Sequence, residues 1–308
     1  MNSLSNSNLK RLVGSFLWGL IFMVGCSKNS APLGSADNPV KFFFVPSIDA
    51  QRLADKGHLV EKYLNANTPY VYKIGVPSSY IAVVESFGTK RADIATLNPF
   101  TYILANEKYG AHAVITPIRA GSETYSGQIV VRADSGIKTI KDLQGKKFAF
   151  VDPVSTSGFL LPGKLIKDAN VTLGETVFAQ RHDNVISMVY QKQVDAGATF
   201  YSPPEDGKIQ DARRLVVTQY PDIEKKVVVL TLTDSIPNDP IVVRKDLPVE
   251  IRDTTVKALL AYMQTEEGKA VFYDLYGMTG MVASSDARYD AIRNVLTAMG
   301  KSAAELVK

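Results

Sequence analysis

The sequence predicts an α/β fold built from two lobes of similar plan. Short runs rich in β-branched and aromatic residues alternate with longer amphipathic runs, a pattern typical of helices packed on mostly parallel sheets. Two helix-strand units with the same layout also lie 102 residues apart, a period too long for a solenoid. A chain of 308 residues with 45% hydrophobic residues can bury one large core or two smaller ones, and the repeat favours two.

Strands are expected where short apolar runs are bounded by turn residues, and helices where apolar positions recur every three or four residues. The first helix is expected over 49–64, capped by Asp49, and the second over 80–87, behind the turn at 77–79. The expected strands are 40–45, 71–76, 94–97, 128–132, 147–151 and 227–232.

The repeated unit places a polar ring residue at a helix start and an aspartate thirteen residues later. These residues are Tyr80 and Asp93 in the first copy, and His182 and Asp195 in the second. In open α/β sheets, ligands bind at the carboxyl ends of strands, next to helix N-termini. We therefore expect Tyr80 and His182 at equivalent mouths of two lobes that share one cleft. The alternative is a chance similarity between two helix-strand units.

Charge and cysteine content argue against several classes of function. The 35 basic and 31 acidic residues give a net charge of +4 without a basic block, so no nucleic-acid partner is expected. The single cysteine, Cys26, excludes an internal disulfide framework and a multi-thiolate zinc site. His58 and His112 have no metal-ligand spacing around them, and the sequence contains no P-loop, HExxH or GxSxG motif. We therefore expect neither a metal nor a cofactor.

Residues 1–25 have the features of a lipoprotein signal peptide. Two basic residues precede an uncharged apolar run of 13 residues, 12–24, which is too short to span a bilayer. Met23-Val24-Gly25-Cys26 resembles the lipobox of bacterial lipoproteins, in which the cysteine is lipidated and becomes the first residue, although a methionine replaces the usual leucine. The alternative is an ordinary signal peptide with an incidental thiol. Residues 26–38, rich in small and polar residues, are expected to form a lipidated tether.

The run Ser155-Thr156-Ser157 follows an apolar strand at a junction between a strand and a helix. Its hydroxyl groups and the free N–H groups of a helix start suit an oxyanion such as a phosphate or phosphonate head group. The alternative is a plain Ser/Thr helix cap, which is common.

The residues around this run resemble a known family. Asp152-Pro153, followed by residues 155–158 and then Leu161-Pro162-Gly163, is similar to the signature of the phosphonate- and phosphite-binding proteins of bacterial ABC importers. Further segments that support the resemblance are 80–105, 125–140, 142–146, 182–199, 236–240 and 244–248.

The resemblance implies the periplasmic binding protein fold of type II, in which two α/β lobes enclose a ligand cleft and a hinge crosses between them twice. The first lobe would comprise residues 39–121 and 236–308, and the second lobe residues 122–235.

The same resemblance implies the residues that bind the ligand. Ser155, Thr156 and Ser157 (residues 155–157) would hold the phosphorus-bound oxygens, Tyr80 and Tyr125 would donate phenolic hydrogen bonds, and His182 would contact the oxyanion from the second lobe. Asp239 would accept from a protonated ligand oxygen or from an ammonium group. Because these donors are mostly neutral, we expect anion capture by placed hydroxyls and helix ends. A reference pKa of about 6.5 would let His182 make the affinity pH-dependent.

Selectivity for an amine is left open by the sequence. Family members that bind aminophosphonates place a glutamate beside the amine, and the corresponding segment here, 200–205, aligns ambiguously. Tyr201 and Glu205 are its candidate contacts, and both would set the space beside the phosphorus.

The function implied by the resemblance is that of a solute-binding lipoprotein, not an enzyme. It would capture a phosphonate, phosphite or related phosphorus oxyanion and deliver it to an ABC permease in the cytoplasmic membrane. We expect a monomer outside the cytoplasm, periplasmic or on the cell surface, anchored to a membrane by its lipid. The alternatives are a sensor module of the same fold, a relative that binds a pyrimidine or another oxyanion, and a secreted hydrolase using Ser155 or Ser157 with His182.

Overall fold

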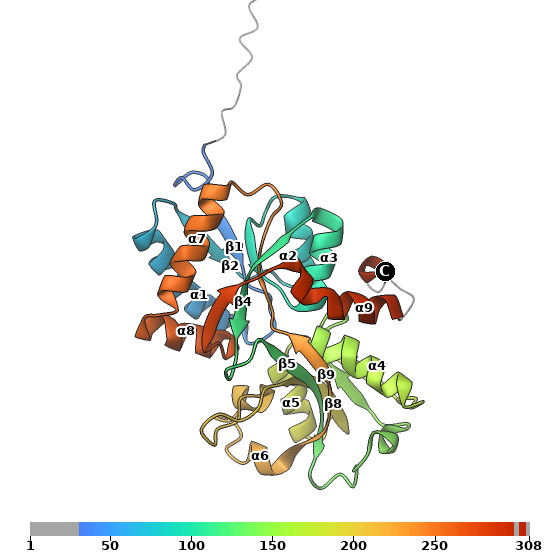
Figure 1. Ribbon diagram of the computed structural model, residues 1–308. Helices are drawn as coiled ribbons and strands as arrows, with labels where there is room; N and C mark the ends of the chain where they lie inside the picture. Colours follow the sequence, from blue (N-terminus) through green and yellow to red (C-terminus); the bar gives the residue numbers. More distant parts are fainter. Residues whose placement is uncertain (1–30, 299–301, 306–308) are drawn as a thin grey trace, which may run out of the picture. The chain divides into compact units, whose positions relative to one another are not determined.

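The computed structural model describes residues 31–298 and 302–305. The predicted signal peptide, 1–25, and the lipidation candidate Cys26 lie outside the described residues, as does the first part of the predicted tether. The described residues from Pro32 onward belong to one unit, which contains two β-sheets (Figure 1). None of the helices in this part of the chain is long and apolar enough to cross a membrane.

The first sheet has the strand order β11-β4-β10-β3-β1-β2. Its strands are β1 (Val40–Phe43), β2 (Tyr72–Gly75), β3 (Ile94–Thr96), β4 (His112–Ile118), β10 (Ile241–Val243) and β11 (Gly280–Ala283). Two groups of helices pack beside it: α1 (Ala50–Asn67), α7 (Val249–Tyr262) and α8 (Glu266–Tyr276) in one, and α2 (Tyr80–Gly88) with α3 (Pro99–Tyr109) and α9 (Asp290–Ala298) in the other.

The second sheet has the strand order β7-β6-β8-β5-β9. Its strands are β5 (Thr124–Arg132), β6 (Phe148–Phe150), β7 (Thr176–Phe178), β8 (Ala196–Tyr201) and β9 (Val227–Pro237). The helices that accompany it are α4 (Leu161–Asp168), α5 (His182–Tyr190) and α6 (Ile223–Lys226), with a π-helical turn, Thr156–Leu160, directly before α4.

The local signals in the sequence locate the first helices correctly. The Asp49 carboxylate accepts a hydrogen bond from the Arg52 N–H at 3.0 Å, so α1 begins at the next residue, and it ends three residues beyond the predicted 64. Ser79 caps α2 in the same way, which starts this helix at Tyr80. Each of the six strand segments predicted from the sequence overlaps an observed strand: β1, β2, β3, β5, β6 and β9.

The prediction of mostly parallel sheets is wrong, because both sheets are mixed. In the first sheet β1 pairs in parallel with β2 and β3, but β10 is antiparallel to β3 and β4. In the second sheet β6 pairs in parallel with β7 and β8, whereas β5 is antiparallel to β8 and β9. The antiparallel pairs arise where the chain leaves one sheet and enters the other, since β4 leads directly to β5 and β9 leads directly to β10.

The repeat predicted from the sequence is present in the structure. Asp93 accepts a hydrogen bond from the Lys41 N–H at 2.8 Å and returns one from its own N–H to the Lys41 carbonyl at 2.9 Å. Asp195 makes the same two contacts with Lys147, at 2.8 and 2.9 Å. Each aspartate thus fixes the start of a strand, β3 or β8, against its parallel neighbour, β1 or β6, and the order β3-β1-β2 matches β8-β6-β7. Helices α2 and α5 therefore occupy equivalent places in the two lobes.

The chain passes between the sheets at 119–123 and again at 238–240. The lobe boundaries predicted at 121/122 and 235/236 lie close to these segments and remain predictions. One cluster of buried apolar side chains has members from both sides of the crossings, including Leu97 and Phe100 from the first lobe and Val154 from the second. The two lobes are therefore in apolar contact beside the cleft.

Candidate ligand-binding cavity

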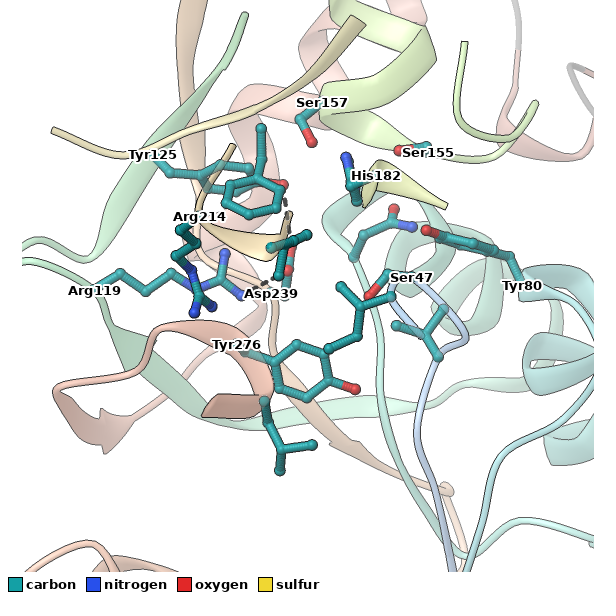
Figure 2. Close-up of a pocket in the computed structure, with 16 residues that line it drawn as sticks. Ser47, Tyr80, Arg119, Tyr125, Ser155, Ser157, His182, Arg214, Asp239 and Tyr276 are labelled. Carbon is teal, nitrogen blue, oxygen red and sulfur yellow. Dashed lines mark hydrogen bonds and ion pairs between the residues drawn. The ribbon is translucent and has the colours of Figure 1, made fainter. Parts of the chain in front are cut away.

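A cavity lies between the two lobes (Figure 2). It is lined by Val45, Ser47, Ile48, Tyr80, Asn98, Arg119, Tyr125, Ser155, Ser157, His182, Phe200, Arg214, Leu215, Asp239, Leu275 and Tyr276. The volume open to the centre of a water-sized atom is about 40 Å³, whereas about 10–15 Å³ is enough for one water molecule. The cavity therefore suits a small ligand.

Most of the site residues predicted from the sequence line this cavity, and three do not. The lining includes Tyr80, Tyr125, Ser155, Ser157, His182 and Asp239. Tyr201, at the end of β8, and Glu205, in a turn bridged to Lys208, are outside the lining. The side chain of Thr156 is also outside it.

Tyr80 supplies a hydroxyl that nothing in the described chain satisfies. Its side chain lies at the first residue of α2 and is 2% exposed, and its hydroxyl oxygen has no hydrogen-bond partner among the described residues. Burial raises the pKa of Tyr80 well above the usual value for a phenol, and Asp152 and Asp239 add to this effect. The hydroxyl is therefore a neutral donor facing the cavity (Figure 2).

Ser155 and Ser157 face Tyr80 from the start of the π-helical turn (Figure 2). The Ser155 hydroxyl caps this turn by accepting a hydrogen bond from the Gly158 N–H at 3.1 Å. The first N–H groups of a helix have no carbonyl acceptor inside the helix, so they add donors next to the serine hydroxyls.

Thr156 joins the two lobes. Its hydroxyl oxygen accepts from the Phe100 N–H at 2.9 Å and donates to the Asn98 side-chain oxygen at 2.8 Å. The Asn98 amide in turn donates to the Val154 carbonyl at 3.1 Å. All of these groups are buried. The start of α3 is therefore held against the turn before α4, and we call Asn98, Phe100, Val154 and Thr156 the interlobe clasp.

An ion pair between a buried arginine and a partly exposed aspartate lies where the chain crosses between the lobes. Arg119, after β4, contacts Asp239, before β10, at 2.8 Å, and the Tyr125 hydroxyl donates to the other oxygen of Asp239 at 3.1 Å. Burial acts to lower the pKa of Arg119, but Asp239 and Tyr125 outweigh it and raise the pKa. Arg119 is therefore charged, and both oxygens of Asp239 already accept hydrogen bonds.

His182, at the start of α5, is held in place on both sides. Its Nδ1 lies 2.7 Å from the Thr199 hydroxyl, and its backbone N–H donates to the Ser47 carbonyl of the first lobe at 3.1 Å. Burial lowers the pKa of His182 to about 3, and Arg119 contributes to the shift. The ring is therefore neutral near pH 7. The sequence led us to expect that His182 titrates near pH 6.5. The structure does not support this expectation, because desolvation disfavours the charged imidazolium.

Two arginines form a cationic part of the cavity that was not predicted from the sequence. Arg119 and Arg214 both line it, so anion capture does not depend on neutral donors alone. Arg119 directly follows a strand pattern, a position that could have drawn attention to it. Arg214 lies in a short helical turn, Ala212–Leu215, and no motif surrounds it. Among the described residues, no group of three or more His, Cys, Asp and Glu side chains could hold a metal ion.

Replacing Thr156 with valine is expected to lower the free energy of unfolding by about 1–2 kcal/mol, because the Asn98 and Phe100 groups lose a buried partner. Urea unfolding measures this change. Thr176→Val, at an exposed position of β7, is the matched control and should stay within about 0.5 kcal/mol of the wild type. Equal stability of the two variants would contradict the interlobe clasp.

The low pKa of His182 predicts acid sensitivity. The unfolded chain takes up a proton at this residue as the pH falls through about 6.5, whereas the folded chain does so only near pH 3. Between these two values, His182 should therefore lower the free energy of unfolding by about 1.4 kcal/mol for each unit by which the pH falls. Urea unfolding between pH 5 and 7.5 should show this slope in the wild type and in His58→Gln, on the exposed face of α1, but a smaller slope in His182→Gln. Identical slopes in all three proteins would refute the assignment.

Known proteins of similar sequence share one class of function. The profile of a family described as the periplasmic substrate-binding protein of phosphonate ABC transporters matches residues 42–289. The phosphate-import protein PhnD of Mycolicibacterium smegmatis is 29% identical over 266 residues, which cover 79% of this chain and 78% of the relative. The phosphonates-binding periplasmic protein of Escherichia coli is 29% identical over 225 residues, 70% of this chain and 63% of the relative.

Solved structures show the same fold. A binding protein component of an ABC phosphonate transporter from Pseudomonas aeruginosa superposes with a TM-score of 0.74 at 22% identity, covering 86% of this chain and 85% of that one. PhnD1 of Prochlorococcus marinus in complex with methylphosphonate gives a TM-score of 0.73 at 19% identity, covering 85% and 98%. The chain belongs to the family of periplasmic substrate-binding proteins of phosphonate ABC transporters.

Proposed function

We propose that this protein captures a small phosphorus oxyanion, such as phosphite or methylphosphonate, and delivers it to an ABC permease in the cytoplasmic membrane. The observation that carries the proposal is a cavity closed between two lobes and lined by O–H and N–H donors. Tyr80, Ser155 and Ser157 provide hydroxyl donors, and His182 provides a neutral ring nitrogen. The Escherichia coli relative described as binding phosphonates and the Prochlorococcus marinus structure in complex with methylphosphonate support this ligand class.

The size of the cavity narrows the choice of ligand. The space that the centres of water-sized atoms can occupy in the cavity is about 40 Å³. This space suits a phosphorus atom with its oxygens and a short substituent, but not a nucleotide or a long alkyl chain. Tyr201 and Glu205 lie outside the lining, so we assign them no contact with the ligand. Thr156 acts on the ligand through the interlobe clasp, which holds Ser155 and Ser157 opposite Tyr80.

The geometry does not favour the hydrolase alternative. A serine nucleophile needs a histidine base that is itself oriented by a carboxylate. The Nδ1 atom of His182 instead contacts the hydroxyl of Thr199 at 2.7 Å. The family is one of solute-binding proteins rather than enzymes.

We propose that the protein works as a monomer, because one chain supplies both walls of the cavity.

Binding should appear as thermal stabilisation. A ligand at about 100 times its Kd adds about 2.7 kcal/mol to the folded state, which for a chain of this size raises Tm by roughly 5–10 °C. Differential scanning fluorimetry with phosphite, methylphosphonate and phosphate at millimolar concentration measures this change. Sulfate is the control anion. A Tm that does not move with any phosphorus oxyanion would contradict the proposal.

Tyr80, whose hydroxyl has no hydrogen-bond partner among the described residues, offers the sharpest variant. Tyr80→Phe removes one hydroxyl and keeps the ring. The affinity for the oxyanion, measured by calorimetry, should therefore fall about tenfold or more. Tyr63→Phe is a control, because Tyr63 lies on α1 and stacks on Tyr262 away from the cavity. Equal affinities of the two variants would place the ligand elsewhere.

We propose further that Cys26 carries a lipid that anchors the protein to a membrane. The position of this cysteine after an apolar run supports the proposal. Cys26→Ala should move the protein from the membrane fraction to the soluble fraction and abolish labelling with radioactive palmitate, whereas Ser27→Ala should change neither. Labelling of the Cys26→Ala variant would refute the anchor.

A further inference from the structure

Arg214 reaches from the second lobe to the end of a helix in the first. Its guanidinium lies 5.5 Å from the centre of the Tyr273 ring, on α8. A Cβ added to Gly277, the residue that ends α8, would lie 3.3 Å from its Nη2 atom. Arg214 lines the ligand cavity (Figure 2). It also lines an outer hollow together with residues of α1 and α8. It therefore separates the cavity from the outside at this point.

Arg214 differs from the other half-buried and buried arginines in having no carboxylate partner in the described chain. Arg119 contacts Asp239, Arg213 contacts Asp211 and Arg244 contacts Asp93, each at 2.7–2.8 Å. The Nε atom of Arg214 is also buried without a hydrogen-bond partner among the described residues, as is that of Arg119, but Arg214 has no ion pair beside it. The Tyr273 ring and the carboxyl end of α8 lie beside its charge, and the nearby carboxylate Asp274 is paired with Lys56 at 2.5 Å.

The cavity therefore has an excess of one positive charge. Its charged lining residues are Arg119, Arg214 and Asp239, and His182 is neutral. Burial lowers the pKa of Arg214 to about 10, with Arg119 adding to the effect, so Arg214 stays protonated near pH 7. Both oxygens of Asp239 are engaged by Arg119 and Tyr125. A ligand ammonium group would find no free carboxylate there, while a second anionic group would find a free guanidinium.

We propose that Arg214 is a specificity-determining residue that binds a carboxylate carried by the ligand. The cavity then favours a phosphonate with a carboxylate one or two atoms from phosphorus over a phosphonate that carries an amine. This inference rests on the proposed function, because it assigns the phosphorus group to Tyr80, Ser155 and Ser157. Figure 2 shows these residues on the side of the cavity opposite the two arginines.

Two physical arguments support this assignment. The planar guanidinium can donate two parallel hydrogen bonds to a carboxylate, and such pairs are strong when they are shielded from water. The small volume of the cavity also limits the spacer between the two anionic groups, which excludes long dicarboxylate-like ligands. Phosphonoformate and phosphonoacetate meet both conditions.

The test compares three ligands in isothermal titration calorimetry on the full chain purified in detergent: methylphosphonate, phosphonoacetate and 2-aminoethylphosphonate. Wild-type protein should bind phosphonoacetate at least about tenfold more tightly than 2-aminoethylphosphonate. Arg214→Gln should lower the affinity for phosphonoacetate at least about tenfold more than it lowers the affinity for methylphosphonate. Arg52→Gln is the matched control, because Arg52 lines only the outer hollow and should leave the ratio between ligands unchanged.

Arg214→Lys guards against a variant that fails to fold. Lysine keeps the charge but cannot form a bidentate hydrogen bond with a carboxylate. This variant should therefore also lower the affinity for phosphonoacetate relative to that for methylphosphonate. The inference is overturned if methylphosphonate binds but the wild type does not bind phosphonoacetate more tightly than 2-aminoethylphosphonate. It is also overturned if the folded Arg214 variants change the affinities for all three ligands equally. If no phosphorus oxyanion binds, the proposed function fails as well, so the two failures are distinguishable.

Discussion

The ion pair of Arg119 and Asp239 is the interaction on which the site depends. Each residue lies on one of the two segments that cross between the lobes, so the pair fixes both crossings at a single point. Arg119 is buried, whereas Asp239 is partly exposed, so loss of Asp239 would leave the Arg119 charge buried without its carboxylate partner. The pair also determines the charge of the cavity. Because Asp239 is committed to Arg119 and Tyr125, the positive charge of Arg214 remains for the ligand.

The internal repeat explains why the cavity is built from two similar walls. Asp93 and Asp195 fix equivalent strands, and these strands follow helices that begin at Tyr80 and His182. Each lobe therefore presents the start of one helix and the ring of its first residue to the cleft. The walls differ in what the rings do, since the Tyr80 hydroxyl has no partner in the described chain whereas the His182 ring contacts Thr199.

Features fixed by local sequence were predictable, and features fixed by tertiary contacts were not. The caps Asp49 and Ser79 act within three residues, so helix starts could be predicted from the sequence. Tyr80 and His182 were predicted to share one cleft because the repeat relates them. The direction of β10 and the cavity-lining position of Arg214 depend on segments far away in the chain. The same is true of the Thr156 hydroxyl, which meets Asn98 across the lobes.

The contacts between the lobes leave two buried donors without partners among the described residues. The interlobe clasp and the bond from the His182 N–H to the Ser47 carbonyl favour the arrangement of the lobes in this structure. The same arrangement leaves the Tyr80 hydroxyl and the Nε of Arg214 buried with no acceptor in the described part of the chain, at a cost of about 1–3 kcal/mol for a neutral group and more for a charged one. An anion that supplied acceptors to these donors would remove that cost only in this arrangement. Such a ligand would stabilise this arrangement over any other by the difference in its affinity for the two.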